Sequence, residues 1–303
     1  MTKFKPALGF IGFGEAGSTI ARGLRSAGIE RLFAFDINTA TPDVGAKICE
    51  RAVETRTTLV ESPAELARSS DILLSTVTSS SALEAAQQTV AFLDPRHTYA
   101  DLNSVSPALK QSIEKVISAS GASFVEAAVM APVQPYGHAV PMLLGGAGAD
   151  AFAAAMTPFG MRLDVLAGAK VGGAAAVKMC RSIVVKGLEA LLFECVMSAS
   201  QFEADDLVFA SLNESFPGMD WKKLADYTAG RVVMHGERRA REMEEVAETL
   251  RAIGVDPIMA EATARRQAWS AQLGLKARFG PDGPKTYREV LDAIVEIGKC
   301  ETE

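Results

Sequence analysis

The sequence predicts an α/β domain with a doubly wound parallel sheet, followed by an all-helical domain. Up to about residue 168, short apolar runs alternate with helical patterns, which is typical of a parallel sheet covered on both faces. Beyond Gly172, helical periodicity continues to the C-terminus without further strand patterns. A length of 303 residues favours two domains over one. We therefore expect a sheet domain over residues 1–170 and a helical domain over residues 171–303.

The first expected β-α-β unit carries three glycines with the spacing G-x-G-x-x-G. A buried strand over residues 7–11 leads into them, and a helix over residues 18–26 follows. In this spacing Gly12 permits a tight turn, Gly14 lets a pyrophosphate approach the backbone, and Gly17 lets the helix lie close to the strand. The helix N-terminus then favours an anion. The sequence thus predicts a dinucleotide site formed by the loop residues Gly12, Phe13, Gly14, Glu15, Ala16 and Gly17.

The expected second strand, residues 32–35, ends in Asp36. This acid follows the glycines by about 20 residues, where a carboxylate accepts both hydroxyls of an adenosine ribose. A carboxylate also repels a 2′-phosphate, so Asp36 favours NAD over NADP. Arg31 and Arg56 leave NADP possible if either lies close to Asp36.

Later strands are expected to end at the same edge of the sheet as the glycine loop. They cover residues 72–75, 98–101, 123–129, 141–144 and about 162–166, with helices near 42–51, 63–68 and 80–92 and another from Pro107. Ligands of such sheets collect at the carboxyl edge, so we expect Thr76 and Val77 to contact the cofactor. Asn103 can hold a carboxamide or a substrate hydroxyl there. Ser104 is a candidate substrate contact, although Ser104 or Ser106 can equally cap the next helix.

Composition and charge exclude several classes of function. The net charge is −6 and the basic residues are dispersed, which argues against an extended nucleic-acid surface. No apolar stretch is long enough to span a bilayer, and the chain runs from Met1 into the first strand without a signal peptide, so we expect a cytoplasmic protein. Widely spaced histidines, His97, His138 and His235, give no support to a metal site. The cysteines are expected to be reduced thiols: Cys49, Cys180, Cys195 and Cys300.

The expected helices of the second half cover residues 173–201, 204–212, 220–231, 238–253, 258–273 and 284–297. The first is about 40 Å long and apolar around most of its circumference, as a helix buried between subunits or domains would be. Lys178 emerges from this apolar surface, where burial and the nearby cations Arg181 and Lys186 disfavour a charged ammonium. A general base needs that property. Ser182 lies one turn further along, where it can position a substrate. From pattern alone, an exposed surface lysine is the alternative.

Three motifs together resemble the β-hydroxyacid dehydrogenase superfamily, which includes 3-hydroxyisobutyrate, tartronate semialdehyde and phosphogluconate dehydrogenases. They are the glycine loop, the turn Asp101-Leu102-Asn103-Ser104, and Gly173 leading to Lys178 at the start of a long helix. The resemblance covers nearly the whole chain. It implies a Rossmann domain, a helical domain that forms a homodimer, and an active site between the domains.

The resemblance also implies roles for individual residues. Lys178 matches the catalytic lysine, and Asn103 and Ser104 match a pair that touches nicotinamide and substrate. Ser182 stands where many relatives have asparagine, and Arg181 precedes it as a candidate substrate contact. Arg241, in Arg241-Glu242-Met243, is expected to replace a second lysine near the cofactor.

One segment departs from the superfamily pattern. Residues 126–137 align with its Ser-Gly-Gly substrate turn but lack both glycines, and they place Met130 and Pro132 there instead. Because proline donates no amide and methionine is apolar, the usual cradle for a small carboxylate is altered, which favours a larger or less polar substrate. Tyr136 and His138 are candidate pocket residues or, equally, loop-packing residues. The Met-Ala-Pro segment and the Lys-x-x-Arg-Ser helix are similar to a branch with an uncharacterised C-terminal domain.

The leading hypothesis is therefore an NAD-dependent oxidoreductase that interconverts an alcohol and its carbonyl, with a small-molecule substrate and Lys178 as acid/base. Oxidative decarboxylation of a 3-hydroxy acid is the nearest alternative, and an imine reductase is a further one. From another class, the chain could be an NAD(H) sensor without turnover. A sensor has no need for a lysine on an apolar helix.

Overall fold

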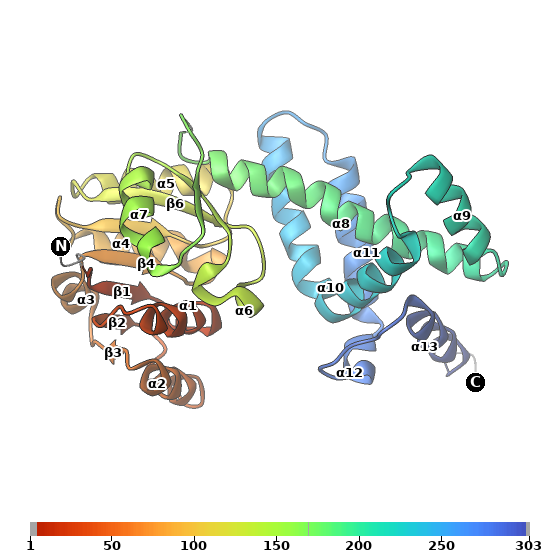
Figure 1. Cartoon of the computed structure of the whole chain (residues 1–303), viewed down its shortest axis with the longest axis horizontal. Helices are drawn as coiled ribbons and strands as arrows, with labels where there is room; N and C mark the ends of the chain where they lie inside the picture. Colours follow the sequence, from red (N-terminus) through yellow and green to blue (C-terminus); the bar gives the residue numbers. More distant parts are fainter. Residues whose placement is uncertain (1–4, 169, 301–303) are drawn as a thin grey trace. The chain divides into compact units, whose positions relative to one another are not determined.

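The computed structural model describes residues 5–168 and 170–300, with side chains described up to residue 297. The chain divides into two compact units, Met1–Lys178 and Met179–Glu303 (Figure 1). The division falls inside helix α8 (Gly173–Ser200). Our expected boundary between residues 170 and 171 stays a prediction.

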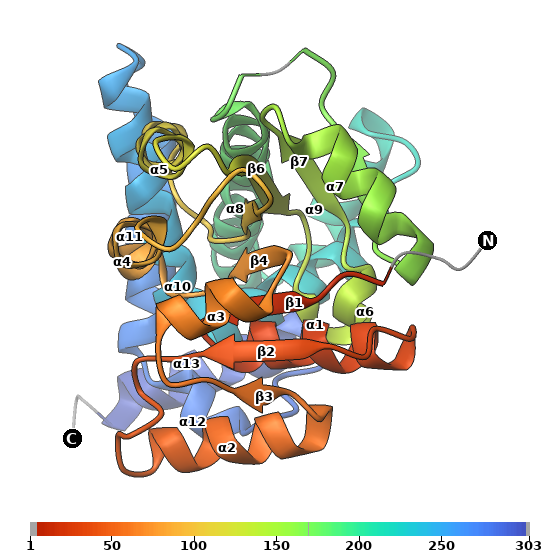
Figure 2. The same ribbon diagram turned by 90° about the vertical axis from the view of Figure 1, so that its left-hand side faces the viewer.

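The N-terminal unit contains an eight-stranded sheet in the order β3-β2-β1-β4-β5-β6-β7-β8 (Figure 2). All neighbouring strands are parallel except β6 and β7, which pair antiparallel. The predicted doubly wound sheet is thus confirmed, with one antiparallel pair and the short strand β3 added. The strands are β1 (Leu8–Ile11), β2 (Leu32–Phe35), β3 (Thr58–Leu59), β4 (Ile72–Ser75), β5 (Thr98–Asp101), β6 (Ser123–Val129), β7 (Met142–Gly145) and β8 (Leu163–Val165).

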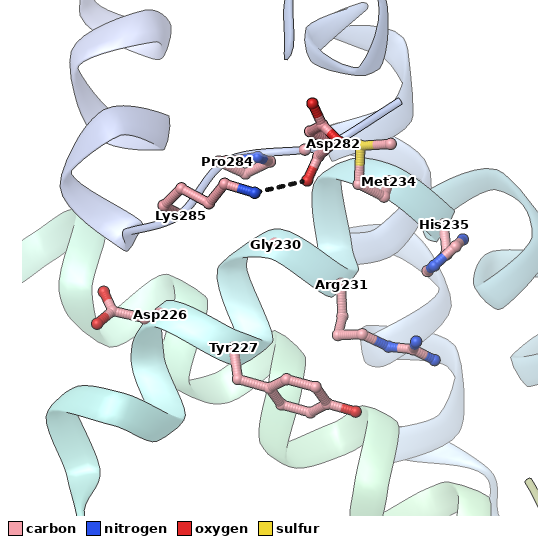
Figure 3. Close-up of a pocket in the computed structure, with 10 residues that line it drawn as sticks. Asp226, Tyr227, Gly230, Arg231, Met234, His235, Asp282, Pro284 and Lys285 are labelled. Carbon is pink, nitrogen blue, oxygen red and sulfur yellow. Dashed lines mark hydrogen bonds between the residues drawn. The ribbon is translucent and has the colours of Figure 1, made fainter. Parts of the chain in front are cut away.

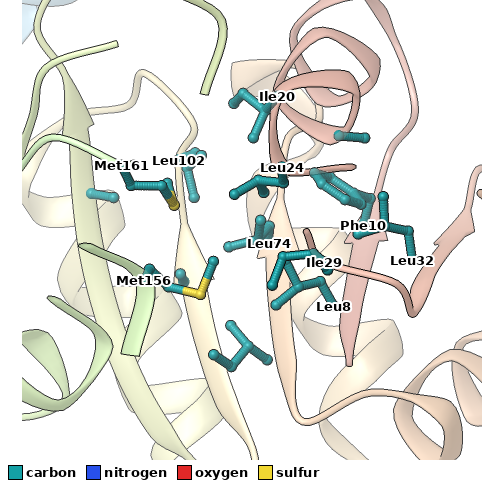
Figure 4. Packing of buried hydrophobic residues seen from close by; sticks show 14 of the residues in the cluster. Leu8, Phe10, Ile20, Leu24, Ile29, Leu32, Leu74, Leu102, Met156 and Met161 are labelled. Atoms are coloured by element: carbon teal, nitrogen blue, oxygen red, sulfur yellow. The ribbon is translucent and has the colours of Figure 1, made fainter. Parts of the chain in front are cut away.

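Two hydrophobic clusters, one on each face, hold helices against this sheet. Alternate residues of a strand point to opposite faces. Phe10 therefore packs with α1 and α2 in one cluster (Figure 4), whereas Ile11 joins the cluster beneath α3, α4 and α5. The helices are α1 (Glu15–Ser26), α2 (Val44–Thr55), α3 (Pro63–Ser69), η1 (Ser79–Ser81), α4 (Ala82–Val90), α5 (Pro107–Ser118), α6 (Val133–Tyr136), η2 (Gly137–Ala139), α7 (Ala149–Met156) and η3 (Thr157–Phe159).

The second unit is helical, as predicted, with two corrections to the expected elements. The segments expected at 220–231 and 238–253 form one continuous helix, α10 (Trp221–Ala252). Gly236 does not interrupt it; a Cβ there would lie 2.8 Å from the Gln267 carbonyl oxygen, so the glycine lets α11 approach closely. The other helices are α9 (Asp205–Ser215), α11 (Ile258–Gln272), α12 (Leu275–Phe279), which was not expected, and α13 (Tyr287–Cys300).

Two further expectations concern membranes and cysteines. Across the described part of the chain, none of the helices combines the length and the apolar character needed to cross a bilayer. Cys49, Cys180 and Cys195 are free thiols. The side chain of Cys300 lies outside the described residues.

Candidate functional site

The glycine loop joins β1 to α1 with the geometry expected of a dinucleotide loop. Gly12 has a φ of +82°, which suits a glycine at a sharp turn. A Cβ on Gly17 would come within 2.7 Å of Thr76 Oγ1, so the glycine permits close packing of α1 on the sheet. A Cβ on Gly14 would meet no atom within 4 Å, which leaves open space over the backbone where a pyrophosphate must approach. The residues present therefore fit a dinucleotide.

Asp36 ties the end of β2 to the glycine loop. Its Oδ2 accepts a hydrogen bond from Phe13 N at 2.8 Å, and its Oδ1 accepts one from Asn38 N at 2.9 Å. Each carboxylate oxygen has a second lone-pair direction, so both can still accept ribose hydroxyls.

The two arginines that left NADP possible lie away from Asp36. Arg31 precedes β2, at the amino edge of the sheet, and pairs with Asp71 at 3.2 Å. Arg56 follows α2, and its carbonyl accepts a hydrogen bond from Arg25, which also bonds the carbonyl of Glu30 just before Arg31. Both residues thus lie at the amino edge of the sheet, whereas Asp36 follows β2 at the carboxyl edge.

Thr76 and Val77 follow β4 at the carboxyl edge. Thr76 Oγ1 donates to the Gly12 carbonyl at 2.7 Å, and a Cβ on Gly12 would lie 2.8 Å from the Val77 side chain. Both residues therefore shape the glycine loop. Direct contact of either with the cofactor stays a prediction.

A row of buried polar residues crosses three neighbouring strands, at the carboxyl ends of β4 and β5 and in the middle of β6. Ser75, Asp101 and Glu126 are in register on β4, β5 and β6, and all three are fully buried. Lys110, on α5, places its Nζ 2.9 Å from Asp101 Oδ2 and 2.7 Å from the Asp101 carbonyl. This polar row was not predicted as part of the site, because it depends on which strands are neighbours.

The polar row fixes the amide of Asn103. Asn103 Nδ2 donates to Ser75 Oγ at 2.9 Å and also to Asp101 Oδ1, while Asn103 N donates to the same Asp101 oxygen at 3.2 Å. A carboxylate only accepts, so the amide nitrogen must face Asp101. Asn103 Oδ1 is consequently buried without a partner and remains an unused acceptor at the ligand edge.

Lys178 and Ser104 lie beside this edge. Lys178 is half-buried in the first part of α8, and its Nζ donates to Ser104 Oγ at 2.6 Å. The cap of α5 is instead Ser106, whose Oγ accepts from Leu109 N at 3.2 Å. The structure thus assigns the cap to Ser106, and a substrate contact of Ser104 stays a prediction.

The segment after β6 is only partly buried. Met130 is half-buried and Pro132 is exposed, as is Tyr136, with 47% of its surface accessible. His138 packs between glycines, since a Cβ on Gly23 of α1 would lie 2.0 Å from its Nδ1 and one on Gly160 would lie 2.9 Å from its Nε2. Burial lowers the pKa of His138. His138 therefore packs against Gly23 and Gly160, and its place in a substrate pocket stays a prediction.

The remaining predicted residues lie in the helical unit. Arg181 is exposed and Ser182 half-buried on α8. Arg241 is exposed on α10 and pairs with Glu237 at 2.6 Å. Their contacts with cofactor or substrate stay predictions.

The helical unit also contains buried ion pairs that the sequence did not reveal. Lys186 Nζ lies 2.8 Å from Glu242, and Arg239 lies 2.8 Å from Glu189. A pocket of about 290 Å³ opens between α10 and the 282–285 segment, where Arg231 and His235 project from α10 (Figure 3). It contains none of the predicted site residues.

The sheet, the glycine loop and Asp36 together define a dinucleotide-binding domain of the Rossmann type. The family described as the NAD binding domain of 6-phosphogluconate dehydrogenase matches residues 7–159, about half of the chain, and the chain belongs to this family. A second family, described as a domain of unknown function, matches residues 199–270 in the helical unit.

Individual relatives agree with this assignment. A conserved hypothetical protein from Sinorhizobium meliloti 1021 is 34% identical, with a TM-score of 0.82 and 97% of each chain covered. A second conserved protein, reported to be structurally similar to 3-hydroxyacid dehydrogenases, is 29% identical, with a TM-score of 0.74 over 89% of this chain and 98% of that one. The mitochondrial 3-hydroxyisobutyrate dehydrogenase of Drosophila melanogaster is 26% identical over 71% of this chain and 64% of its own length. The homology supports a hydroxyacid oxidoreductase.

Proposed function

We propose that the protein oxidises or reduces a hydroxy acid, or a larger hydroxyl compound, with Lys178 as the general acid/base. The observation that carries this proposal is the pairing of Lys178 Nζ with Ser104 Oγ at 2.6 Å, next to the fixed amide of Asn103. Bound NAD supplies the hydride acceptor. An amine at this edge can take the proton of a substrate hydroxyl as the carbonyl forms, and return it in the reverse reaction.

Asn103 and Ser104 are proposed to orient the reacting groups. The unused Asn103 Oδ1 accepts a hydrogen bond from a carboxamide N–H or a substrate hydroxyl. Ser104 is exposed beside the amine, so its hydroxyl can hold the substrate oxygen within reach of Lys178. Without the two glycines of the family turn, Met130 and Pro132 offer an apolar surface instead, which fits a larger substrate.

The experiment is a screen of hydroxy acids and larger alcohols, including 3-hydroxyisobutyrate, for NADH formation, repeated with NADP. With the active compound, Lys178→Met should lower turnover by about two orders of magnitude or more. Affinity for NADH should remain nearly unchanged. Lys115→Met, which removes an exposed lysine of α5, is the matched control and should keep full activity. Unchanged turnover in Lys178→Met contradicts the assigned role.

The same screen separates the alternative functions. Release of CO2 together with NADH formation would establish oxidative decarboxylation. Tight NADH binding with no turnover across the panel would favour a sensor. A cytoplasmic location stays a prediction throughout.

A homodimer through the helical unit is part of the proposal. Val184 and Leu191 are 69% and 63% exposed and lie seven residues apart on α8, and so on the same side of the helix. Phe202, in the following turn, is 82% exposed. A second copy of the chain would cover these apolar side chains.

A further inference from the structure

A single buried carboxylate joins the sheet to the first turn of α8. Glu126 Oε2 accepts a hydrogen bond from Gly172 N, and Glu126 Oε1 accepts one from Ala175 N, both at 2.7 Å. Gly172 directly precedes α8, and Ala175 is its third residue. These are the two donors that a capping box satisfies. Because Gly172 has no side chain that could accept from Ala175 N, the Glu126 carboxylate of β6 accepts both hydrogen bonds.

The surroundings are built to hold this carboxylate. Gly145 is paired with Glu126 on β7, and a Cβ there would lie 2.9 Å from Glu126 Oε2. Val171, the residue before Gly172, is also fixed. Gln111 Nε2 donates to its carbonyl at 3.1 Å, and its side chain is buried in the cluster beneath α5. The chain that leads into α8 is therefore held at several points.

Lys178 follows Ala175 by three residues, about one helical turn. The direction in which its side chain leaves α8 depends on how that first turn is anchored. We propose that Glu126 is a positioning residue, which holds the first turn of α8 so that Lys178 reaches Ser104 at the edge of the sheet. This inference rests on the proposed role of Lys178.

The proposal also includes an effect of the Glu126 charge on Lys178. A carboxylate at a helix N-terminus offsets the positive end of the helix dipole, which favours an ammonium nearby. Asp101 is in register with Glu126 on β5, and Lys110 pairs with Asp101. Both stay in place when Glu126 is neutralised. In Glu126→Gln, the neutral amine of Lys178 should therefore prevail at lower pH than in the wild-type protein.

Two readouts need no substrate. The first is hydrogen exchange of the amides in residues 171–178, and the second is the pH dependence of Lys178 acetylation by acetic anhydride, followed by mass spectrometry. Glutamine has one acceptor oxygen in place of two, so Glu126→Gln leaves one helix donor unpaired. Exchange in this segment should rise about tenfold, the scale of one lost helix cap. The midpoint of acetylation should move to lower pH.

Two other variants sharpen the test. Gly145→Ala crowds the carboxylate but keeps its charge, so it should speed exchange without moving the acetylation midpoint. Glu65→Gln is the matched control, because Glu65, in the first turn of α3, accepts from Glu61 N, just before the cap Ser62, at 3.0 Å. It should loosen α3 and leave residues 171–178 unchanged. Gly145→Ala also provides the exchange measurement if Glu126→Gln does not fold.

Wild-type exchange in residues 171–178 of both Glu126→Gln and Gly145→Ala would overturn the proposal. So would faster exchange with an acetylation profile of Lys178 identical to that of the wild type in Glu126→Gln. These outcomes are distinct from failure of the proposed function, which is decided by the turnover of Lys178→Met. If that variant keeps its turnover while Glu126 still controls the amine, the catalytic role fails and the anchoring stands.

Discussion

Replacing Asp36 with asparagine should shift the cofactor preference toward NADP by two to three orders of magnitude. The side chain keeps its shape but loses its charge. A hydrogen bond to a charged acceptor contributes about 1.5–3 kcal/mol, so NAD should bind about ten- to a hundredfold more weakly. Two unit charges about 5 Å apart interact with about 3 kcal/mol at an effective dielectric constant of about 20. Because Asp36 is half-exposed, solvent screens this interaction, and its repulsion of a 2′-phosphate is about 1–2 kcal/mol. Removing this repulsion should raise the affinity for NADP roughly tenfold.

The same substitution weakens the glycine loop, because the amide cannot accept from both Phe13 N and Asn38 N. That loss affects both cofactors alike. The quantity to measure is therefore the ratio of the Kd for NADPH to the Kd for NADH, determined by calorimetric titration. The loss of loop stability cancels in this ratio, whereas the charge effect does not.

Asp71→Asn is the matched control for this ratio. Asp71 Oδ2 accepts from Ala7 N at 2.8 Å, so its replacement also weakens a backbone contact of β1, but at the amino edge beside Arg31. The ratio should stay at the wild-type value. A ratio in Asp36→Asn within twofold of wild type would show that Asp36 does not determine cofactor choice.

Two more predictions concern the helical unit. Burial, followed by nearby cations, lowers the pKa of His235 to about 4. Since the unfolded chain then binds more protons, stability should fall as the pH drops from about 6.5 toward 4, and His235→Gln should reduce this loss in thermal unfolding measured at pH 7 and pH 5. Replacing both Val184 and Leu191 with lysine should give a monomer in sedimentation equilibrium, whereas Val53→Lys, on α2, should remain dimeric. A wild-type chain that sediments as a monomer would refute the dimer.

The sequence predicted those parts of the fold that a local pattern encodes. The strands at 72–75, 98–101 and 123–129 begin and end where expected, because each is an apolar run bounded by turn residues. The strand β3 has only two residues, too few for a periodic pattern, and α7 is largely alanine, which gives little contrast between its faces. The expected break between residues 231 and 238 is absent from α10, and Gly236 within that stretch serves instead for a close contact with α11.

The candidate site divides in the same way. The glycine loop and Asp36 are local motifs and were predicted from spacing alone. Glu126 appeared in the sequence only as the first residue of a segment that lacks the family glycines. Its contacts with Gly172 and Ala175 span 46 and 49 residues, and no pattern within one strand indicates them. A charged residue inside an otherwise apolar strand was the available signal, because such a residue needs a buried partner.

The polar row also suggests which part of the site is free to vary with the substrate. Ser75 and Asp101 hold Asn103, and Glu126 holds the turn before Lys178. The proposed orienting amide and the proposed acid/base are therefore tied to adjacent strands. Neighbouring strands are spaced about 4.8 Å apart by their hydrogen bonds, which makes the separation of these groups a property of the sheet. The segment after β6 has no such constraint at Pro132 and Tyr136, which are exposed. We therefore expect substitutions there to change which substrate is accepted, while substitutions in the polar row change the rate for every substrate.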